Sequence, residues 1–382
     1  MTSARSRVSR GLRRVIPVAV LVALLGFFAA IHLDDGATAS AVIRLATAGA
    51  VDPQPSVRSP QELPIRVRVE TAESIQQWSD SEGRARIVAA APLSLWEVVT
   101  LGRFLAIDSL VMRNSEHFGN DPIWFMLALS SESALDPLAK GIEPGDRGLG
   151  QVGYASETAA RAWAADEQSP YRVAGFDPGR NIWDPEQNIL LASIVLRSLY
   201  AMDDVETHPQ AYARYTHGLK AVQGGNLSPD SEVRVKRAQS YEESTRLFFA
   251  LANLDVSGTS APLLEDRFVR RLLEINRDHE DGMEMYRALR QAYIAEAARP
   301  DVTPWQFALL MREALTYSQL EHVVTGVPSE RDVAEIVDLL DAQLPVIRAV
   351  GDAVLLDLVT ETLAEARSGD AVARTRLSEV AP

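Results

Sequence analysis

The sequence contains no cysteine among its 382 residues. This absence excludes disulfide bonds, iron–sulfur clusters, thiol nucleophiles and zinc sites built from thiolates. Histidine is also rare, and none of the six histidines has a second histidine four residues away, the spacing that is typical of a zinc site on a helix. We therefore predict neither a metal nor a cofactor.

Basic residues are in the minority. Lys and Arg number 38 against 52 Asp and Glu, which gives a formal net charge of -14 at pH 7. Proteins that bind nucleic acid release counterions from it with clustered basic side chains, and an acidic chain is poorly suited to this. We expect no nucleic-acid partner, and instead a ligand that is uncharged or of mixed charge.

Strand patterns are scarce as well. Residues 63–70 alternate apolar and polar side chains and predict one short strand. Over most of the remaining chain the apolar residues recur at helical spacing. One example is a helix whose apolar stripe runs over residues 95–112 and which ends at Gly119. The sequence therefore predicts a mainly α fold.

Start signals mark several of these helices. A residue that can cap a helix N-terminus is followed by apolar residues at helical spacing, and proline often fills the first turn. The predicted caps are Asp121 before Pro122, Asp184 before Pro185, Thr303 and Ser329.

The N-terminus predicts a membrane segment. Arginines cluster in residues 1–14, and residues 15–33 contain no Asp, Glu, Lys or Arg. At about 1.5 Å per residue this run spans nearly the roughly 30 Å hydrocarbon core of a bilayer. The basic cluster predicts a cytoplasmic N-terminus and a chain that otherwise lies outside the cytoplasm, in a periplasmic or similar compartment. A signal peptide cleaved near residues 37–39 is the alternative. Residues 34–64, rich in small residues and proline, predict a linker.

Three glycines, Gly148, Gly150 and Gly153, spell the Gly-x-Gly-x-x-Gly fingerprint of a dinucleotide-binding loop. That loop requires an apolar strand directly before its first glycine. Here residues 138–147 form a largely polar stretch interrupted by glycine and proline. The motif therefore does not predict a dinucleotide site.

Glu132 is the first candidate for catalysis. It lies at the end of an apolar helical run, between Ser131 and Ser133 and next to a loop. A carboxyl group in this position can be half-buried, which would raise its pKa toward the value that a general acid needs. The alternative is an exposed glutamate at a helix end.

Four short motifs follow one another in the order "ESALDP", "RGLGQV", "WDPEQNI" and "ARYTHG". This succession, over about residues 108–250, resembles the lytic transglycosylase domain of the soluble type, which cleaves peptidoglycan and has the goose-type lysozyme fold. In that family a helix ends in Glu-Ser, a loop carries Gly-Leu-Met-Gln, a later helix opens with Asp-Pro-x-x-Asn, and another carries Ala-Tyr-Asn-x-Gly. The resemblance implies a lysozyme-like α-helical catalytic domain over residues 108–255.

The resemblance also implies roles for four residues. Glu132 would be the single catalytic acid, Ser133 would orient it or the substrate, and Gln151 and Tyr215 would line the cleft. Glu132 would protonate the β-1,4 glycosidic oxygen between N-acetylmuramic acid and N-acetylglucosamine, and the muramyl C6 hydroxyl would then attack C1 to give a 1,6-anhydro end. Nearby Asp136, Glu143 and Asp146 are interpreted as solvated loop charges, and Asp184 as a helix cap.

The sequence departs from the family pattern at three positions. Gly150 stands where the family has Met, and Thr216 and His217 stand where Asn and a small residue are usual. Two alternatives therefore stay open: a catalytically weak scaffold that binds peptidoglycan in an envelope assembly, and a goose-type lysozyme-like hydrolase that uses water. The glycines of the loop are expected to let the backbone approach the sugar.

The remaining segments flank this predicted domain. Residues 65–107 are interpreted as a helical lead-in, and residues 256–382 as a C-terminal helical region that matches no motif. Its acidic, amphipathic helices would suit packing on the catalytic domain or docking of a protein partner.

Overall fold

The computed structural model describes residues 95–141, 145–252, 266–279, 282–327 and 330–368. These residues are mainly helical, as the sequence predicts. Their strands are the two-residue β1 (Val222–Gln223) and β2 (Asn226–Leu227), which pair antiparallel. The predicted membrane segment 15–33, the linker, the short strand at 63–70, the cap at Ser329 and most of the lead-in lie outside the described residues. Within the described part of the chain, no helix is both long and apolar enough to cross a membrane.

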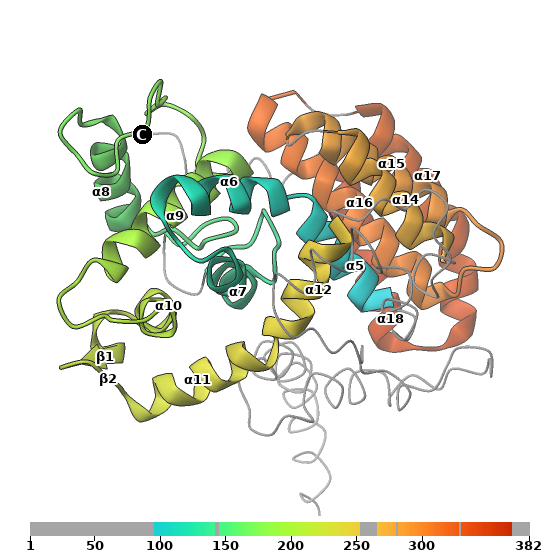
Figure 1. Ribbon diagram of the computed structural model, residues 1–382. Helices are drawn as coiled ribbons and strands as arrows, with labels where there is room; N and C mark the ends of the chain where they lie inside the picture. Colours follow the sequence, from blue (N-terminus) through green and yellow to red (C-terminus); the bar gives the residue numbers. More distant parts are fainter. Residues whose placement is uncertain (1–94, 142–144, 253–265, 280–281, 328–329, 369–382) are drawn as a thin grey trace, which may run out of the picture. The chain divides into compact units, whose positions relative to one another are not determined.

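The first group of helices runs from α5 to α12 (Figure 1). It comprises α5 (Leu95–Leu105), α6 (Asp108–Phe118), α7 (Pro122–Ser133), α8 (Tyr154–Ala165), α9 (Pro185–Tyr200), α10 (His208–His217), the short 3-10 helix η3 (Leu219–Ala221), α11 (Pro229–Ser240) and α12 (Glu242–Ala252). The second group comprises α14 (Arg267–Asp278), α15 (Met283–Ala297), α16 (Pro304–Thr325), α17 (Glu330–Val350) and α18 (Ala353–Arg367). The predicted boundary between the two regions, at residues 255–256, falls outside the described residues.

Three predicted helix starts are confirmed. The Asp121 carboxylate accepts hydrogen bonds from the backbone N–H groups of residues 123 and 124, at 2.9 and 3.0 Å. Asp184 accepts from the Glu186 N–H at 3.0 Å, and Thr303 forms a capping box with Gln306. Each cap satisfies a donor that the first helical turn leaves unpaired.

The single helix predicted over residues 95–112 is wrong in one respect, because it is broken between Leu105 and Asp108 into α5 and α6. A contact from another helix stabilises the break. The Asn276 side chain of α14 donates hydrogen bonds to the Leu105 carbonyl and the Asp108 carboxylate, both at 2.9 Å. A carbonyl that would otherwise lose its partner is thereby satisfied. The predicted end at Gly119 is confirmed, since this glycine caps α6 in the left-handed conformation.

Helix α7 lies at the centre of the first group (Figure 1). One side of it, with Phe125 and Leu129, joins the large buried core. The other side, with Trp124 and Leu127, packs in a smaller cluster that includes Tyr212 of α10. Because it is buried on both sides, α7 holds its C-terminal end, and Glu132 with it, in a fixed place.

The second group of helices shares the large core with the first. Helix α5 contacts both α14 and α16, and α12 contacts α5, α7 and α14. In Figure 1, α5 and α12 lie between α6 and α7 on one side and the helices from α14 onward on the other. Buried residues from Val98 to Ala366 form one continuous cluster, so the C-terminal helices are packed on the helices that position α7.

Candidate functional site

Glu132 is the next-to-last residue of α7. After Ser133 the chain leaves the helix through two residues with left-handed backbone, Ala134 with φ of 51° and Leu135 with φ of 59°. The Ala134 N–H still donates to the Ser130 carbonyl at 2.9 Å. The turn directs the chain away from the helix axis immediately after the glutamate, so that Glu132 lies where α7 meets the following loop.

Glu132 is half-buried, and its environment favours the protonated form. Burial raises its pKa from 4.5 to about 8; the Arg234 guanidinium opposes this rise and the Asp146 carboxylate adds to it. Among the described residues the Glu132 side chain forms neither a salt bridge nor a hydrogen bond. A carboxyl group with this pKa carries a proton at neutral pH, which is the state a general acid requires. The alternative of an ordinary exposed glutamate is therefore wrong.

The two serines beside Glu132 have different surroundings. Ser133 is only 4% exposed, and its hydroxyl donates to the Leu129 carbonyl one turn back at 2.9 Å. Ser131 Oγ lies 2.8 Å from the hydroxyl of Tyr212. In this arrangement Ser133 is bonded to its own helix, and the predicted role of Ser133 in orienting Glu132 or a substrate stays a prediction.

The loop that carries Gly148, Gly150 and Gln151 is fixed by Asn188 of α9. The Gly150 N–H donates to Asn188 Oδ1 at 2.7 Å, and Asn188 Nδ2 donates to the Arg147 carbonyl at 2.9 Å. Asn188 is 1% exposed. The asparagine of the Asp-Pro-x-x-Asn motif thus fastens the Gly-Leu-x-Gln loop, a role that the sequence analysis did not assign.

Gly150 and Gly148 make room for protein side chains. A Cβ atom on Gly150 would lie 2.5 Å from Ala192 Cβ and 2.8 Å from the Tyr215 hydroxyl oxygen, and one on Gly148 would lie 2.5 Å from Asn188 Nδ2. The absence of side chains here therefore has a packing reason, and the expectation that these glycines let the backbone approach a sugar stays a prediction. The same contacts explain why a larger residue is absent at position 150.

Gln151 holds the loop from within. It has a left-handed backbone with φ of 46°, and its side-chain Nε2 donates to the carbonyls of Ala139 at 2.9 Å and Gly148 at 2.6 Å. The side chain is half-buried. Gln151 therefore ties the loop to the chain that leaves α7, and its predicted contact with a substrate stays a prediction.

Tyr215 of α10 closes the same loop from the other side. Its hydroxyl donates to the Gly150 carbonyl at 2.6 Å. Burial raises its pKa well above the ordinary value, and the nearby carboxylates of Glu132 and Asp146 add to the rise. The phenol consequently stays protonated and remains a donor. Tyr215, Glu132 and the loop thus come together, although they are far apart in the sequence.

Two charged residues lie at the site although neither of them was assigned a role there from the sequence. Asp146 is half-buried and close enough to raise the pKa of Glu132, so its interpretation as a solvated loop charge is wrong. Arg234 of α11 donates to the Thr216 carbonyl at 3.5 Å. Burial lowers the pKa of Arg234, while Tyr212 and Glu132 oppose that change. No motif marks Arg234, because it reaches the site only through the packing of α11 on α10.

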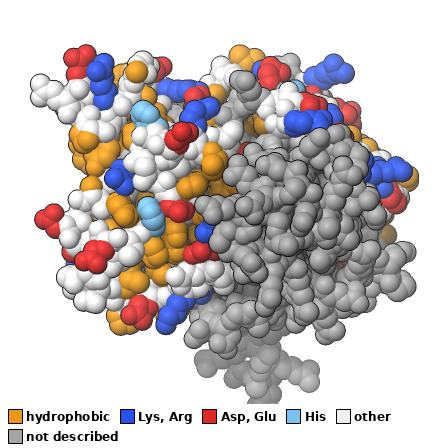
Figure 2. All heavy atoms as spheres, viewed as in Figure 1, with side chains coloured by type: hydrophobic (Ala, Val, Ile, Leu, Met, Phe, Trp, Pro, Cys, Tyr) orange, Lys and Arg blue, Asp and Glu red, His pale blue; other side chains and the backbone are white. Residues whose placement is uncertain are grey.

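The surface over α8 to α10 carries acidic and basic side chains interspersed with hydrophobic ones on the face shown in Figure 2. Among the described residues there is no group of three or more His, Asp or Glu placed to hold a metal ion. The expected uncharged or mixed-charge ligand fits this kind of surface.

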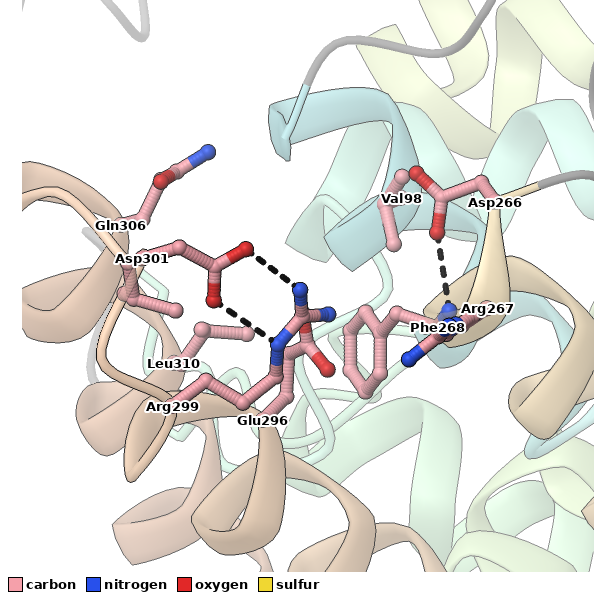
Figure 3. Close-up of a pocket in the computed structure, with 10 residues that line it drawn as sticks. Val98, Asp266, Arg267, Phe268, Glu296, Arg299, Asp301, Gln306 and Leu310 are labelled. Carbon is pink, nitrogen blue, oxygen red and sulfur yellow. Dashed lines mark hydrogen bonds and ion pairs between the residues drawn. The ribbon is translucent and has the colours of Figure 1, made fainter.

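A cavity of about 420 Å³ lies apart from Glu132, where α5, the start of α14 and the connection from α15 to α16 meet (Figure 3). Its walls include Val98, Phe268 and an ion pair in which Arg299 donates to both carboxylate oxygens of Asp301, at 3.0 and 2.5 Å. Arg267 also lines this cavity, and Glu132 is not among the lining residues.

Comparison with known proteins adds no relative to this description. No family model matches the sequence, and neither the curated proteins nor the solved structures give a match.

Proposed function

We propose that this protein is a peptidoglycan lytic transglycosylase with a lysozyme-like catalytic domain and Glu132 as its acid. The observation that carries the proposal is the place of Glu132: a half-buried carboxyl at the end of α7 without an ion pair or hydrogen bond among the described residues, whose burial raises its pKa to about 8. The order of the four motifs supports the substrate, the glycan strand of peptidoglycan. Tyr215 and Asp146 of the loop lie near the acid, and Asn188 fastens that loop.

The reaction requires one carboxyl group that acts twice. Glu132 donates its proton to the glycosidic oxygen as the bond to C1 of N-acetylmuramic acid breaks, and N-acetylglucosamine leaves. The carboxylate then accepts the proton of the muramyl C6 hydroxyl while that oxygen bonds to C1. The proton returns to Glu132, and the product carries a 1,6-anhydro ring. Atoms and charge balance without water.

A second carboxyl group would be needed for the usual retaining hydrolysis, about 5 Å from the first. Asp146 is the nearby carboxylate, but it is packed against backbone. Its Oδ1 lies 2.7 Å from where a Cβ of Gly153 would be, and its Oδ2 lies 3.0 Å from that position on Gly141. A half-buried carboxylate that lies against the backbone of Gly141 and Gly153 favours the single-carboxyl mechanism. Asp146 instead contributes by keeping Glu132 protonated.

We place the catalytic helices outside the cytoplasm, tethered by residues 15–33. The basic residues 1–14 followed by an uncharged run support a single-pass anchor, with export by a signal peptide as the alternative. The substrate of this kind of enzyme is in the cell wall, and the tether would hold Glu132 near it.

The test is mass spectrometry of purified sacculi treated with the full chain in detergent, beside its Glu132→Gln variant. We expect 1,6-anhydro-muropeptides from the parent protein and none from the variant. Reducing ends that depend on Glu132 would identify a hydrolase. Sacculi that bind the protein without release of fragments would contradict the enzyme and favour the scaffold.

A further inference from the structure

The turn that follows Glu132 has a left-handed backbone conformation, which residues with a Cβ atom rarely adopt. Ala134 and Leu135 are successive non-glycine residues with positive φ, a conformation that persists only where surrounding contacts impose it. Leu135 is 3% exposed, so packing provides part of that restraint. The turn needs a further partner for its carbonyl groups, because they no longer lie in a helix.

Arg103 of α5 supplies that partner. Its Nη1 donates to the Ala134 carbonyl at 3.1 Å. Its Nε and Nη2 donate to the two carboxylate oxygens of Glu313, at 2.9 and 2.5 Å. The side chains of Arg103 and Glu313 are 11% and 5% exposed. A guanidinium held by a two-pronged ion pair presents its remaining N–H in a fixed direction.

The same turn leads into the loop that carries Gly148, Gly150 and Gln151. The Leu138 N–H donates to Asp136 Oδ1 at 2.8 Å, which shapes the next residues. The Ala139 carbonyl then accepts hydrogen bonds from the Gly148 N–H and from Gln151 Nε2, both at 2.9 Å. Movement of the turn would therefore displace Glu132 at one end and Gln151 at the other.

We propose that the C-terminal helices help to position Glu132, and that Glu313 of α16 and Arg103 of α5 are the positioning residues for this acid. The inference rests on the proposed function. It assigns a role to the C-terminal region, which matches no motif. In this role α16 fixes Arg103, Arg103 fixes the left-handed turn, and the turn fixes the depth at which the Glu132 carboxyl is buried.

The test replaces the ion pair by apolar side chains, in the variant Arg103→Met/Glu313→Leu of the full chain. Such replacements commonly leave a protein folded, so positioning can be separated from folding. The rate of anhydro-muropeptide release is measured as a function of pH, beside the thermal midpoint. We expect a rate lower by about ten- to a hundredfold. The high-pH limb of the profile should move to lower pH, because water that reaches Glu132 lowers its pKa.

The control is Arg312→Met/Glu365→Leu. This pair joins α16 to α18 at 2.7 Å, and its side chains are 37% and 26% exposed. We expect the control to keep the rate and the pH profile of the parent. The proposal is overturned if the Arg103 and Glu313 variant keeps both, or if the control loses both to the same extent. Should the Arg103 variant fail to fold, Arg103→Lys replaces it, and a parental rate and profile in that variant overturn the proposal equally.

Failure of this proposal is distinguishable from failure of the proposed function. If the parent releases no fragments, the function is wrong. Hydrogen exchange at the amides of Asp136 and Leu138 still reports the turn without any substrate. We expect faster exchange there in the Arg103→Met/Glu313→Leu variant than in the control, and equal exchange would contradict the positioning role.

Discussion

Two glutamates in two regions of this molecule differ in their surroundings. Glu313 of α16, among the C-terminal helices, is 4% exposed and receives both prongs of Arg103. Glu132, at the end of α7, is half-buried and receives no ion pair or hydrogen bond within the described residues. A paired carboxylate stabilises a packed interface only while its partner remains. An unpaired buried carboxyl instead takes up a proton, so the two glutamates differ in ionisation as well as in their partners.

The C-terminal helices repeat the paired arrangement. Glu321 accepts hydrogen bonds from Arg287 at 2.7 Å and Arg290 at 2.5 Å. Burial alone would raise its pKa, but these two arginines lower it below the ordinary value. For Glu132, burial raises the pKa and Arg234 only partly opposes it. The same residue type is thus ionised in one region and protonated in the other.

The largest expected effect comes from removing the proton donor. Glu132→Gln should lower the rate of glycan cleavage by about 10³-fold, because an amide has no proton to give at neutral pH. The thermal midpoint should stay the same or rise, since no partner loses a contact. Rates on sacculi and calorimetry check the two parts. A variant that unfolds would contradict the description of Glu132 as unpaired.

The next effect is on stability. Glu313→Gln should lower the free energy of unfolding by about 3 kcal/mol, because it leaves the buried Arg103 guanidinium without its carboxylate. Chemical denaturation measures this loss. If Glu313→Gln were tolerated as well as Glu132→Gln, the contrast between the two glutamates would disappear.

A smaller loss is expected at the loop that carries Gly148, Gly150 and Gln151. Gly150→Ala should cost about 2 kcal/mol by overpacking, because its Cβ would approach Ala192 and the Tyr215 hydroxyl. Activity should fall with stability, since the hydrogen bond from Tyr215 to the loop is disturbed. Gly179→Ala is the control, as its Cβ would meet only Asp177 Oδ1 at 3.3 Å. Equal stability of the two variants would be the contrary result.

Much of the α7 region could be predicted from the sequence. The Asp121 cap, Pro122 and the uninterrupted apolar residues indicate a buried helix, and the motif order singles out Glu132 at its end. The left-handed residues Ala134 and Leu135 could not be predicted, because both are types that avoid this backbone. Their conformation depends on contacts made after the chain has folded.

The charges near Glu132, and those that hold the turn after it, could not be predicted from the sequence for a related reason. Arg103 and Glu313 are 210 residues apart, and neither belongs to a recognisable motif. From the sequence, Asp146 is an ordinary loop residue. Only the structure shows that Asn188 holds this loop in place. The positions of these charged side chains depend on packing between helices that are distant in the sequence. The periodicity of apolar residues predicts only the helices themselves.

Stability should depend on pH in opposite ways at the two kinds of glutamate. The folded-state pKa of Glu132, about 8, exceeds 4.5, so its carboxyl stabilises the fold at low pH and this contribution is lost as pH rises from about 4.5 to about 8. Relative to the parent, Glu132→Gln should become more stable across that window, by about 1 to 2 kcal/mol after solvent screening.

The pH dependence expected at Glu321 is the opposite of that at Glu132. Its pKa is lowered, so its contribution is present above the unfolded pKa and is lost as pH falls through the folded one. Glu321→Gln should therefore approach the parent in stability under acidic conditions. Denaturant titrations at several pH values measure both trends, and parallel curves for the two variants would contradict the contrast.

The smallest expected effect belongs to Arg234. Its positive charge lowers the pKa of Glu132, so Arg234→Gln should move the high-pH limb of the activity profile to higher pH. Arg237→Gln, on the same helix, is the control. The pH–rate profile on sacculi checks the direction, and a shift to lower pH would show that Arg234 acts in another way.

The most direct test of the account is the titration of Glu132 itself. The carboxyl carbons of ¹³C-labelled glutamate are followed by NMR from pH 4 to pH 9, and the Glu132→Gln variant assigns the signal. We predict a midpoint at about 8. A midpoint near the ordinary 4.5 would mean that Glu132 is ionised at neutral pH, and it would contradict the claim that this residue is the acid.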